Sequence, residues 1–447
     1  MQRSGSASAK QRQLPLDDPG DEPASGKGST SDSVQPSPLM ACVLSRDNLR
    51  RALRQVQRNK GAPGIDGMTV EALADHLRQH WPAIRQQLIR ETYRPQPVRR
   101  VSIPKPQGGY RPLGIPTVLD RFIQQAIAQV IQAQWEPHFH RHSYGFRPGR
   151  SAHQAVRQIQ AYAREGQAWV VDLDLEAFFE RVNHDRLMKR LQRHTADRAL
   201  LRLVNRYLKA GVRIDGATQA TRSGVPQGGP LSPVLANVVL DELDWELERR
   251  GLRFARYADD CQIYVGSRRA GERVMVNLQR FIEDSLRLTV NPRKSAVDRP
   301  WKRSFLGFTL SRKGFRLKVA AKPLAKLKQD IRRLSRRTRG HRVSQIIDDL
   351  RESLLGWKAY FGIAEVVSPL RDLDKWLRRK LRCYVWKQWG RKGYRALRKR
   401  GVSVELAWNT AKSAHGPWRL SRSPALALAL PARYFRNRGL PELAAQR

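Results

Sequence analysis

The chain has 447 residues, of which 40% are hydrophobic, and its 84 Lys and Arg against 40 Asp and Glu give a formal net charge of +44. This apolar content excludes a wholly disordered chain, and the length predicts two to four domains. The charge indicates a polyanionic partner, with nucleic acid as the first candidate. The sequence contains no uninterrupted apolar run of about 18 residues and no secretory signal pattern. We therefore expect a cytoplasmic protein without membrane contact.

The first 44 residues are predicted to form a disordered tail. Up to about Pro38 they consist mainly of Ser, Gly, Pro, Asp and Gln, with scarcely any large apolar side chain to bury. Folded structure is expected from about Ser45, which is a candidate N-cap. Leu49, Leu53 and Val56 follow at helical spacing, before a loop rich in Gly and Pro.

The middle of the chain alternates strand and helix patterns. The segment WVVDLDL, residues 169–175, predicts a strand whose Asp172 and Asp174 share one face. Further on, Ser232 is a candidate N-cap and Pro233 occupies the first helical position, followed by apolar residues along one helical face. This second pattern predicts a core helix.

The segment RFARYADDCQIYV, residues 253–265, predicts a β-hairpin. Apolar and aromatic residues flank a short Ala-Asp-Asp, which puts Asp259 and Asp260 at the hairpin tip. Adjacent carboxylates repel each other unless a cation compensates them. Mg²⁺ prefers carboxylate oxygens, and two such ions support in-line phosphoryl transfer. On the dipeptide alone, a solvated turn rich in Asp is the alternative.

Beyond residue 310, apolar residues recur at helical spacing in three segments, which predicts a small three-helix bundle. The third segment runs into a stretch where Arg and Lys interleave with Trp and Tyr, a pattern typical of phosphate contacts and base stacking. We expect Trp376 and Tyr384 in the core and the cations on an RNA-binding surface. The candidate RNA contacts are Arg378, Arg379, Lys380, Arg382 and Lys387.

The order of the motifs resembles the catalytic palm of reverse transcriptases: Asp-x-x-x-Phe-Phe, then Pro-Gln-Gly, Tyr-Ala-Asp-Asp, LTVNPRKS and FLGF. Around them, NKGAPGIDGMT, IPKPQGGYRPLGIP and YGFRPGRSAHQA resemble group II intron-encoded reverse transcriptases, the maturases. The resemblance runs from about Ser45 to the C-terminus and implies an α+β fold of the right-hand polymerase type, whose antiparallel palm sheet carries the YADD hairpin. The implied domains are α/β fingers (residues 45–165), palm (166–310), a three-helix thumb or maturase domain (311–395) and a basic segment similar to the family's DNA-binding segment (396–447).

The resemblance also implies roles for single residues. Asp174 and Asp259 match the ligands of two Mg²⁺ ions and Asp260 is the second aspartate of the motif, whereas Asp172 does not match and is expected to be a structural neighbour. Phe179 falls at the position that packs under the incoming sugar, which favours dNTPs. The other implied nucleotide contacts are Lys105 and Arg111 at the triphosphate, Gln227 and Gly228 under the nascent base pair, and Lys294 near the pyrophosphate. For Lys294, a solvated lysine at a strand end is the alternative.

The implied function is that of an RNA-directed DNA polymerase of a mobile group II intron. It would copy the intron RNA template into cDNA from a DNA primer or target with dNTPs, and would assist splicing. Two alternatives remain: an RNA-binding splicing factor with little polymerase use, and a reverse transcriptase recruited to DNA repair or defence. The sequence shows no cysteine pairs or His/Asn-type nuclease motif, so we expect the type that lacks an endonuclease. It departs from the family at Glu180, usually Asp, and at Gly229, where many relatives have Ser or Thr.

Overall fold

The computed structural model describes residues 35–104, 108–338 and 340–445. The chain divides into two compact units, one formed by Met1–Ala155 with Val171–Val297 and the other by Val156–Val170 with Asp298–Arg447. The second unit begins ahead of residue 311, where the sequence predicts the thumb to start. Among the helices in these three ranges, none is long and apolar enough to cross a bilayer.

Helix α4 (Val118–Trp135) lies at the centre of the helical part of the first unit, where it contacts α1 and α2. Its N-cap is Thr117, whose side-chain oxygen accepts a hydrogen bond from the amide of Asp120 at 3.1 Å. Phe122 and Ile127 of α4 are fully buried. The other helices of this part are α1 (Pro38–Leu44), α2 (Arg46–Asn59), α3 (Leu73–Ile89), α6 (Phe178–Arg181), α7 (His184–Leu191) and α8 (Arg198–Lys209).

The chain is folded from Pro38 onward, so the prediction of a disordered tail is wrong for residues 38–44. Asp197, the N-cap of α8, accepts hydrogen bonds from the Ser37 hydroxyl at 2.7 Å and from the Leu39 amide at 2.9 Å. Met40 and Val43 of α1 are buried in the core. A helix of seven residues is too short to show a periodic pattern in the sequence. Residues 1–34, the rest of the predicted tail, lie outside the described part of the chain.

One four-stranded sheet of the first unit has the order β2-β1-β4-β5. Strands β1 and β2 are antiparallel, with Pro104 opposite Tyr110 at the far end of the ladder. Residues 105–107, which join them, lie outside the described ranges. The strands are β1 (Val98–Pro104), β2 (Tyr110–Ile115), β4 (Val212–Ile214) and β5 (Ala217–Gln219).

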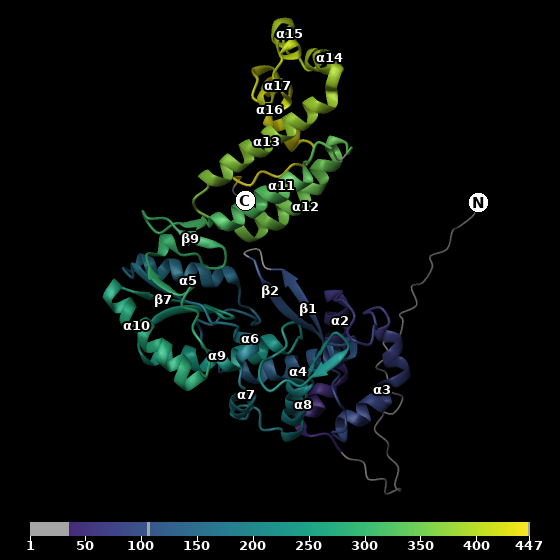
Figure 1. Ribbon diagram of the computed structural model, residues 1–447, viewed down its shortest axis with the longest axis vertical. Helices are drawn as coiled ribbons and strands as arrows, with labels where there is room; N and C mark the ends of the chain where they lie inside the picture. Colours follow the sequence, from purple (N-terminus) through teal and green to yellow (C-terminus); the bar gives the residue numbers. More distant parts are fainter. Residues whose placement is uncertain (1–34, 105–107, 339, 446–447) are drawn as a thin grey trace, which may run out of the picture. The chain divides into compact units, whose positions relative to one another are not determined.

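The second sheet has the order β6-β7-β3-β8 and contains the predicted strand and hairpin. Figure 1 shows α9 and α10 beside it, and α9 contacts β6 while α10 contacts β7. The predicted core helix is confirmed as α9, but it begins at Ser232 itself, whose hydroxyl donates to the Pro226 carbonyl at 2.6 Å instead of capping. The elements are β3 (Trp169–Leu173), β6 (Arg253–Tyr257), β7 (Asp260–Val265), β8 (Ala296–Asp298), α9 (Ser232–Arg249), α10 (Arg268–Phe281) and the π-helical turn η1 (Ile282–Leu286).

The second unit contains the predicted three-helix bundle. Helices α11 (Ala321–Leu334), α12 (Val343–Phe361) and α13 (Ser368–Trp389) contact one another in sequence order and bury one apolar stripe each. Tyr384 is buried as predicted, whereas Trp376 is only half-buried. The bundle is preceded by α5 (Ala152–Arg164), most of which belongs to this unit, by η2 (Pro300–Lys302) and by the antiparallel pair β9 (Phe308–Leu310) and β10 (Leu317–Val319).

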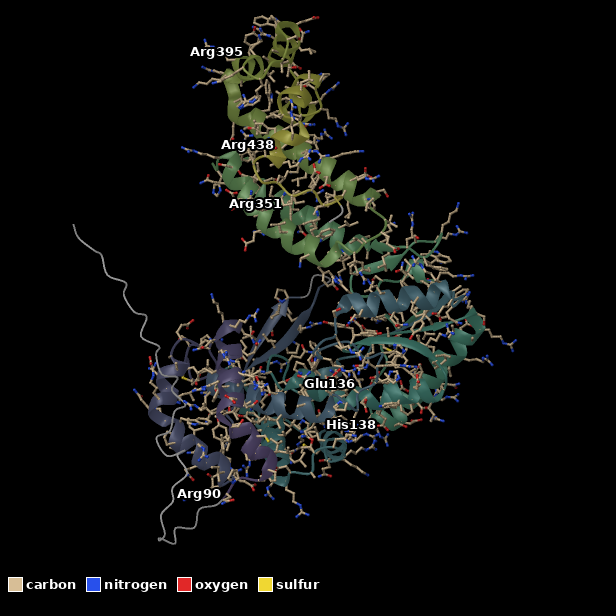
Figure 2. All side chains as sticks on the ribbon, turned by 180° about the vertical axis from the view of Figure 1, so that it is seen from behind. Arg90, Glu136, His138, Arg351, Arg395 and Arg438 are labelled. Atoms are coloured by element: carbon tan, nitrogen blue, oxygen red, sulfur yellow. The ribbon has the colours of Figure 1, made fainter. Side chains whose placement is uncertain are left out.

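Short helices follow the bundle and return to it. Asp374 of α13 accepts hydrogen bonds from the amides of Leu443 at 3.0 Å and Ala444 at 2.9 Å. Arg351 of α12 donates to the Gly439 carbonyl at 2.8 Å, next to Arg438 (Figure 2). The C-terminal segment is therefore fastened to the bundle. Its elements are η3 (Gly390–Lys392), α14 (Gly393–Arg398), α15 (Val404–Lys412), α16 (Pro417–Leu420), α17 (Pro424–Ala429) and α18 (Ala432–Arg436).

Candidate active site

The two adjacent aspartates lie at the tip of the β6–β7 hairpin, as the sequence predicts. Tyr257 pairs with Asp260, which leaves Ala258 and Asp259 as a two-residue turn. Ala258 has a φ of +56°, and the tight turns that suit hairpins require a positive φ at this first position. The turn therefore holds Asp259 outside the strand ladder, directly before Asp260.

Asp174 follows the last residue of β3, the neighbour of β7 in the sheet. Its backbone is fixed on both sides, because its amide donates to the Ser295 hydroxyl at 3.0 Å and its carbonyl accepts from the Asn291 amide at 2.8 Å. These bonds come from the LTVNPRKS motif. They fix the main chain that carries the Asp174 carboxylate, beside the hairpin strand.

The carboxylates are close enough to influence one another. Desolvation by the surrounding chain, followed by the charges of Asp259, Asp172 and Asp174, raises the pKa of Asp260 to about 6, while Lys294 acts in the opposite direction. The structure thus brings together the three predicted catalytic aspartates. Asp172 joins them as a neighbour, and its carboxylate accepts a hydrogen bond from the Gln262 amide at 3.1 Å.

Lys294 also lies at this cluster. Its ammonium nitrogen is 3.2 Å and 3.4 Å from the two carboxylate oxygens of Asp174. Since the side chain of Lys294 is 62% exposed, it can leave Asp174 without disturbing the core. An exposed cation therefore offsets one of the carboxylates in this structure.

The donor set suits a hard divalent cation. It consists of carboxylate oxygens, the ligands that Mg²⁺ prefers. A bound cation would relieve the carboxylate repulsion that, after desolvation, contributes to the raised pKa of Asp260. Among the described residues, no group of three or more His, Cys, Asp or Glu side chains is already arranged to hold a metal ion. The residues fit Mg²⁺ by the chemistry of their oxygen donors, without forming a preformed metal site.

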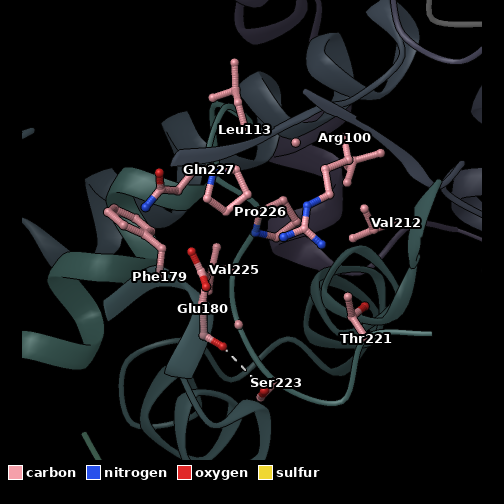
Figure 3. A pocket seen from close by; sticks show the side chains of 14 residues that line it. Arg100, Leu113, Phe179, Glu180, Val212, Thr221, Ser223, Val225, Pro226 and Gln227 are labelled. Carbon is pink, nitrogen blue, oxygen red and sulfur yellow. Dashed lines mark hydrogen bonds between the residues drawn. The ribbon is translucent and has the colours of Figure 1, made fainter. Parts of the chain in front are cut away.

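The predicted nucleotide contacts Phe179 and Gln227 line a cavity of about 250 Å³ between the β1–β2 ladder and the Pro-Gln-Gly loop (Figure 3). Both also border a second cavity of about 550 Å³, which Gly228 and Phe146 line as well. Figure 3 shows the Glu180 side chain in the first cavity together with Arg100. Glu180, one of the departures from the family, therefore lies directly beside the predicted sugar position.

The Pro-Gln-Gly loop approaches β2 too closely for side chains. Gly228 has a φ of +126°, and a Cβ there would lie 2.6 Å from the Gly114 carbonyl oxygen. At Gly229 a Cβ would lie 2.3 Å from the side-chain oxygen of Gln124, a buried residue. The Gly114 amide completes the contact by donating to the Gln227 carbonyl at 2.8 Å. At Gly229, the second departure from the family, a side chain would therefore require Gln124 to shift.

Phe179 is half-buried at the rim of these cavities. Its ring meets that of the buried Phe178 edge to face at a centroid distance of 5.1 Å, and its carbonyl accepts from the Val225 amide at 2.6 Å. Arg111 is exposed on β2. Lys105, the other predicted triphosphate contact, lies outside the described residues.

The candidate RNA contacts of α13 fall into two groups. Arg379 donates to the Trp418 carbonyl at 3.1 Å and its guanidinium lies 3.7 Å from the centre of the Trp418 ring, while Arg382 donates to the Leu430 carbonyl at 3.0 Å. These two side chains pack the C-terminal segment onto α13. Of the other three, Arg378 and Lys380 are half-buried, and Lys387 is exposed. Lys380 lies over the ring of Trp376, 5.6 Å from its centre.

Two families of known proteins match the chain. Residues 103–310 match the family described as reverse transcriptase (RNA-dependent DNA polymerase), and residues 324–402 match the maturase-specific domain of group II introns. The chain belongs to the group II intron-encoded reverse transcriptases and maturases, and its enzyme class is RNA-directed DNA polymerase.

Two relatives illustrate the extent of the similarity. Protein YkfC of Escherichia coli is 33% identical over 309 residues, which are 60% of this chain and 81% of YkfC. The group II intron-encoded protein LtrA of Lactococcus lactis is 38% identical over 221 residues, which are 49% of this chain but 36% of LtrA. Among solved structures, a telomerase from Candida albicans in complex with telomeric RNA is 13% identical with a TM-score of 0.43, and the match covers 68% of this chain and 63% of the telomerase.

Proposed function

We propose that the protein extends a DNA primer along group II intron RNA with dNTPs in the cytoplasm, and that it assists the splicing of that RNA. The observation that supports the polymerase site is the cluster of Asp174, Asp259 and Asp260, in which desolvation and the neighbouring carboxylate charges raise the pKa of Asp260 to about 6. The net charge of +44 supports RNA as the bound polyanion.

Asp174 and Asp259 would hold two Mg²⁺ ions, with Asp260 beside them, and these ions would stabilise the charge that develops during in-line nucleotidyl transfer. The protein's own residues place the reactants. The fixed backbone of Asp174 and the strained turn at Ala258 hold the carboxylates at neighbouring points of one sheet. Lys294, within reach of the site, would then pair with the leaving pyrophosphate instead of Asp174.

The remaining contacts select and orient the nucleotide. The Phe179 ring would exclude a ribose 2′-hydroxyl, and the closely packed Gln227–Gly228 backbone would support the nascent base pair. Arg111 and Lys105 would hold the triphosphate from the β1–β2 hairpin, where a forked guanidinium and an ammonium suit phosphate oxygens.

The decisive experiment is primer extension on an RNA template by the purified protein and its Asp259→Asn variant. The variant should make no product, because it loses a metal-binding carboxylate charge, and should bind RNA with nearly unchanged affinity, because the large positive field is intact. Extension by the variant in Mg²⁺ would contradict the site. A group II intron ribozyme in the DNA flanking the gene would favour the intron role over recruitment to repair or defence.

A further inference from the structure

Arg256 is a fully buried arginine, 0% exposed, that stands three residues before Asp259. Its guanidinium forms a forked ion pair with Asp244 of α9, in which Nε donates to one carboxylate oxygen at 2.7 Å and Nη2 to the other at 2.5 Å. Asp244 is equally inaccessible to solvent. No sequence motif indicates a role for Arg256, because it is one cation among 84 and its partner Asp244 lies on another element.

The other guanidinium hydrogens are also used. Nη1 donates to the Asn237 side-chain oxygen at 3.0 Å and to the Ala258 carbonyl at 2.9 Å, and Nη2 donates to the Ser143 hydroxyl at 2.7 Å. A guanidinium has five N–H groups, so every donor of Arg256 has an acceptor. Such complete satisfaction fixes the group in one orientation.

The bond to Ala258 connects this buried group to the candidate active site. The Ala258 carbonyl belongs to the planar peptide unit that leads into Asp259. Ala258 has a positive φ of +56°, which is unfavourable for a residue with a side chain and persists only where the surroundings hold it. The Arg256 hydrogen bond is such a constraint, because it sets the plane of the peptide from which Asp259 projects.

A second segment is packed against the same turn. A Cβ at Gly145 would lie 2.3 Å from the Ala258 amide nitrogen, and the Gly145 carbonyl accepts from the Asn237 side chain at 2.8 Å. The backbone of Arg256 bonds to this segment too, since its carbonyl accepts from the Tyr144 amide at 2.8 Å. The motif YGFRPGRS, α9 and the turn therefore meet at Arg256.

We propose that Arg256 is a positioning residue for nucleotidyl transfer: it orients the Ala258–Asp259 peptide, and with it the Asp259 carboxylate, from within the core. This inference rests on the proposed role of Asp259. The alternative is a purely structural role, in which Arg256 and Asp244 form a buried ion pair that contributes only to stability. The positioning role predicts that turnover still falls when the ion pair is replaced by apolar residues, because the hydrogen bond to the Ala258 carbonyl is lost. The structural role predicts that turnover recovers with stability.

The test uses the double variant Arg256→Met, Asp244→Leu in the full chain. Removing one partner of a buried ion pair strands the other charge, whereas replacing both by apolar residues is often neutral for stability. The unfolding midpoint of the double variant should therefore lie closer to wild type than that of Arg256→Met alone. Its kcat for primer extension should still fall about 10- to 100-fold, because small misplacements of a catalytic group are costly. The KM for dNTP should change little, and the Mg²⁺ concentration for half-maximal rate should rise.

A matched control is the double variant Arg190→Met, Glu242→Leu. Arg190 is also buried and donates to the Val238 carbonyl at 3.1 Å, and it pairs with both Glu242 and Asp241 of the same helix α9. Within the described part of the chain, its side chain's hydrogen-bond and ion-pair partners belong to α9 and not to the hairpin turn. This variant should show a comparable change in unfolding midpoint, with kcat and the Mg²⁺ requirement within about twofold of wild type.

Recovery of kcat and of the Mg²⁺ requirement together with stability in the Arg256→Met, Asp244→Leu variant would overturn the proposal. If that variant does not fold, Arg256→Lys decides. A lysine keeps the charge opposite Asp244 but lacks the fork, so a folded Arg256→Lys protein with wild-type kcat would equally overturn the positioning role. A different result would contradict the polymerase proposal itself, namely primer extension by the Asp259→Asn variant.

Discussion

The ammonium of Lys294 lies 3.2 Å from a carboxylate oxygen of Asp174, and it also opposes the rise in the pKa of Asp260. One exposed lysine thus compensates charge on two of the three candidate catalytic aspartates. In this role it competes with any divalent cation for Asp174. Its position predicts how metal use depends on pH.

Mg²⁺ should bind more weakly as the pH falls through about 6, because the Asp260 carboxylate then takes up a proton. The Mg²⁺ concentration for half-maximal primer extension, measured between about pH 5.5 and 8, should rise on the acidic side. In Lys294→Gln, which lacks the charge that lowers the pKa of Asp260, the rise should begin at a higher pH. A requirement for Mg²⁺ that is the same at every pH in both proteins would contradict this prediction.

The raised pKa of Asp260 also affects stability. Acid weakens Mg²⁺ binding, but through the same group it increases the free energy of unfolding. Because the folded chain holds the Asp260 proton more tightly than the unfolded chain, the contribution of this group to the free energy of unfolding increases as the pH falls from about 6 towards its ordinary pKa. Asp260→Asn should therefore stabilise the protein at pH 7 and make less difference at low pH. Thermal unfolding of both proteins across this range measures the effect.

Phe179 should set the preference for deoxynucleotides. Phe179→Val opens the rim of the cavity that the ring borders, so incorporation of rNTPs relative to dNTPs should rise roughly 10- to 100-fold. Phe178 provides the control, because it is its sequence neighbour but is buried. Phe178→Leu should lower the free energy of unfolding by about 1 kcal/mol or more and leave the ratio unchanged. An unchanged ratio in Phe179→Val would refute the steric role.

The sequence was sufficient to predict that the three candidate catalytic aspartates lie near one another, because their neighbourhood follows from local patterns. An alternating strand ends at Leu173, directly before Asp174, and a hairpin turns at Asp259. Both strands lie side by side in one sheet. The order of the motifs suggested their roles, and the family match over residues 103–310 includes all three aspartates.

What the sequence could not predict depends on partners far along the chain. Arg256 is bonded to Ser143, 113 residues away, and no local pattern links the two. Arg379 and Arg382 stand in a basic stretch that is typical of an RNA-binding surface, yet they donate to carbonyls 39 and 48 residues away. In each case the arginine is unremarkable in sequence, and only the fold shows which acceptors surround it.

Deletion variants can show where the folded part of the chain begins. Removing residues 1–34 should leave the unfolding midpoint and the polymerase rate unchanged. Removing residues 1–44 should destabilise the protein by about 3 kcal/mol or more, because Met40 and Val43 no longer fill the core and Asp197 loses its bonds to Ser37 and Leu39. Equal stability of the two truncated proteins, measured by denaturant unfolding, would show that α1 contributes nothing.

The cations of α13 should separate into RNA contacts and structural contacts. Neutralising Arg378, Lys380 and Lys387 together should weaken binding of intron RNA and reduce protein-assisted splicing. The slope of log affinity against log salt should become shallower by about two to three units, since each lost phosphate contact removes roughly 0.7 to 0.9. Arg379→Gln with Arg382→Gln should instead lower thermal stability, because these side chains hold the C-terminal segment.

Three exposed arginines of α10, Arg269, Arg273 and Arg280, supply the control. Changing all three to Gln removes the same charge from a helix to which no RNA contact is assigned. The slope of log affinity against log salt should therefore change by less than the roughly two to three units expected for the α13 variant. The Asp174→Asn, Asp259→Asn double variant tests the opposite separation. It should make no cDNA and still support splicing, because folding a ribozyme RNA requires a binding surface on the protein but no metal ion held by it. Both activities are measured on the cognate intron or a close relative. If the aspartate variant loses splicing, or the α13 variant keeps full splicing and an unchanged slope, RNA docking has to be sought in the fingers, where Arg111 is exposed on β2.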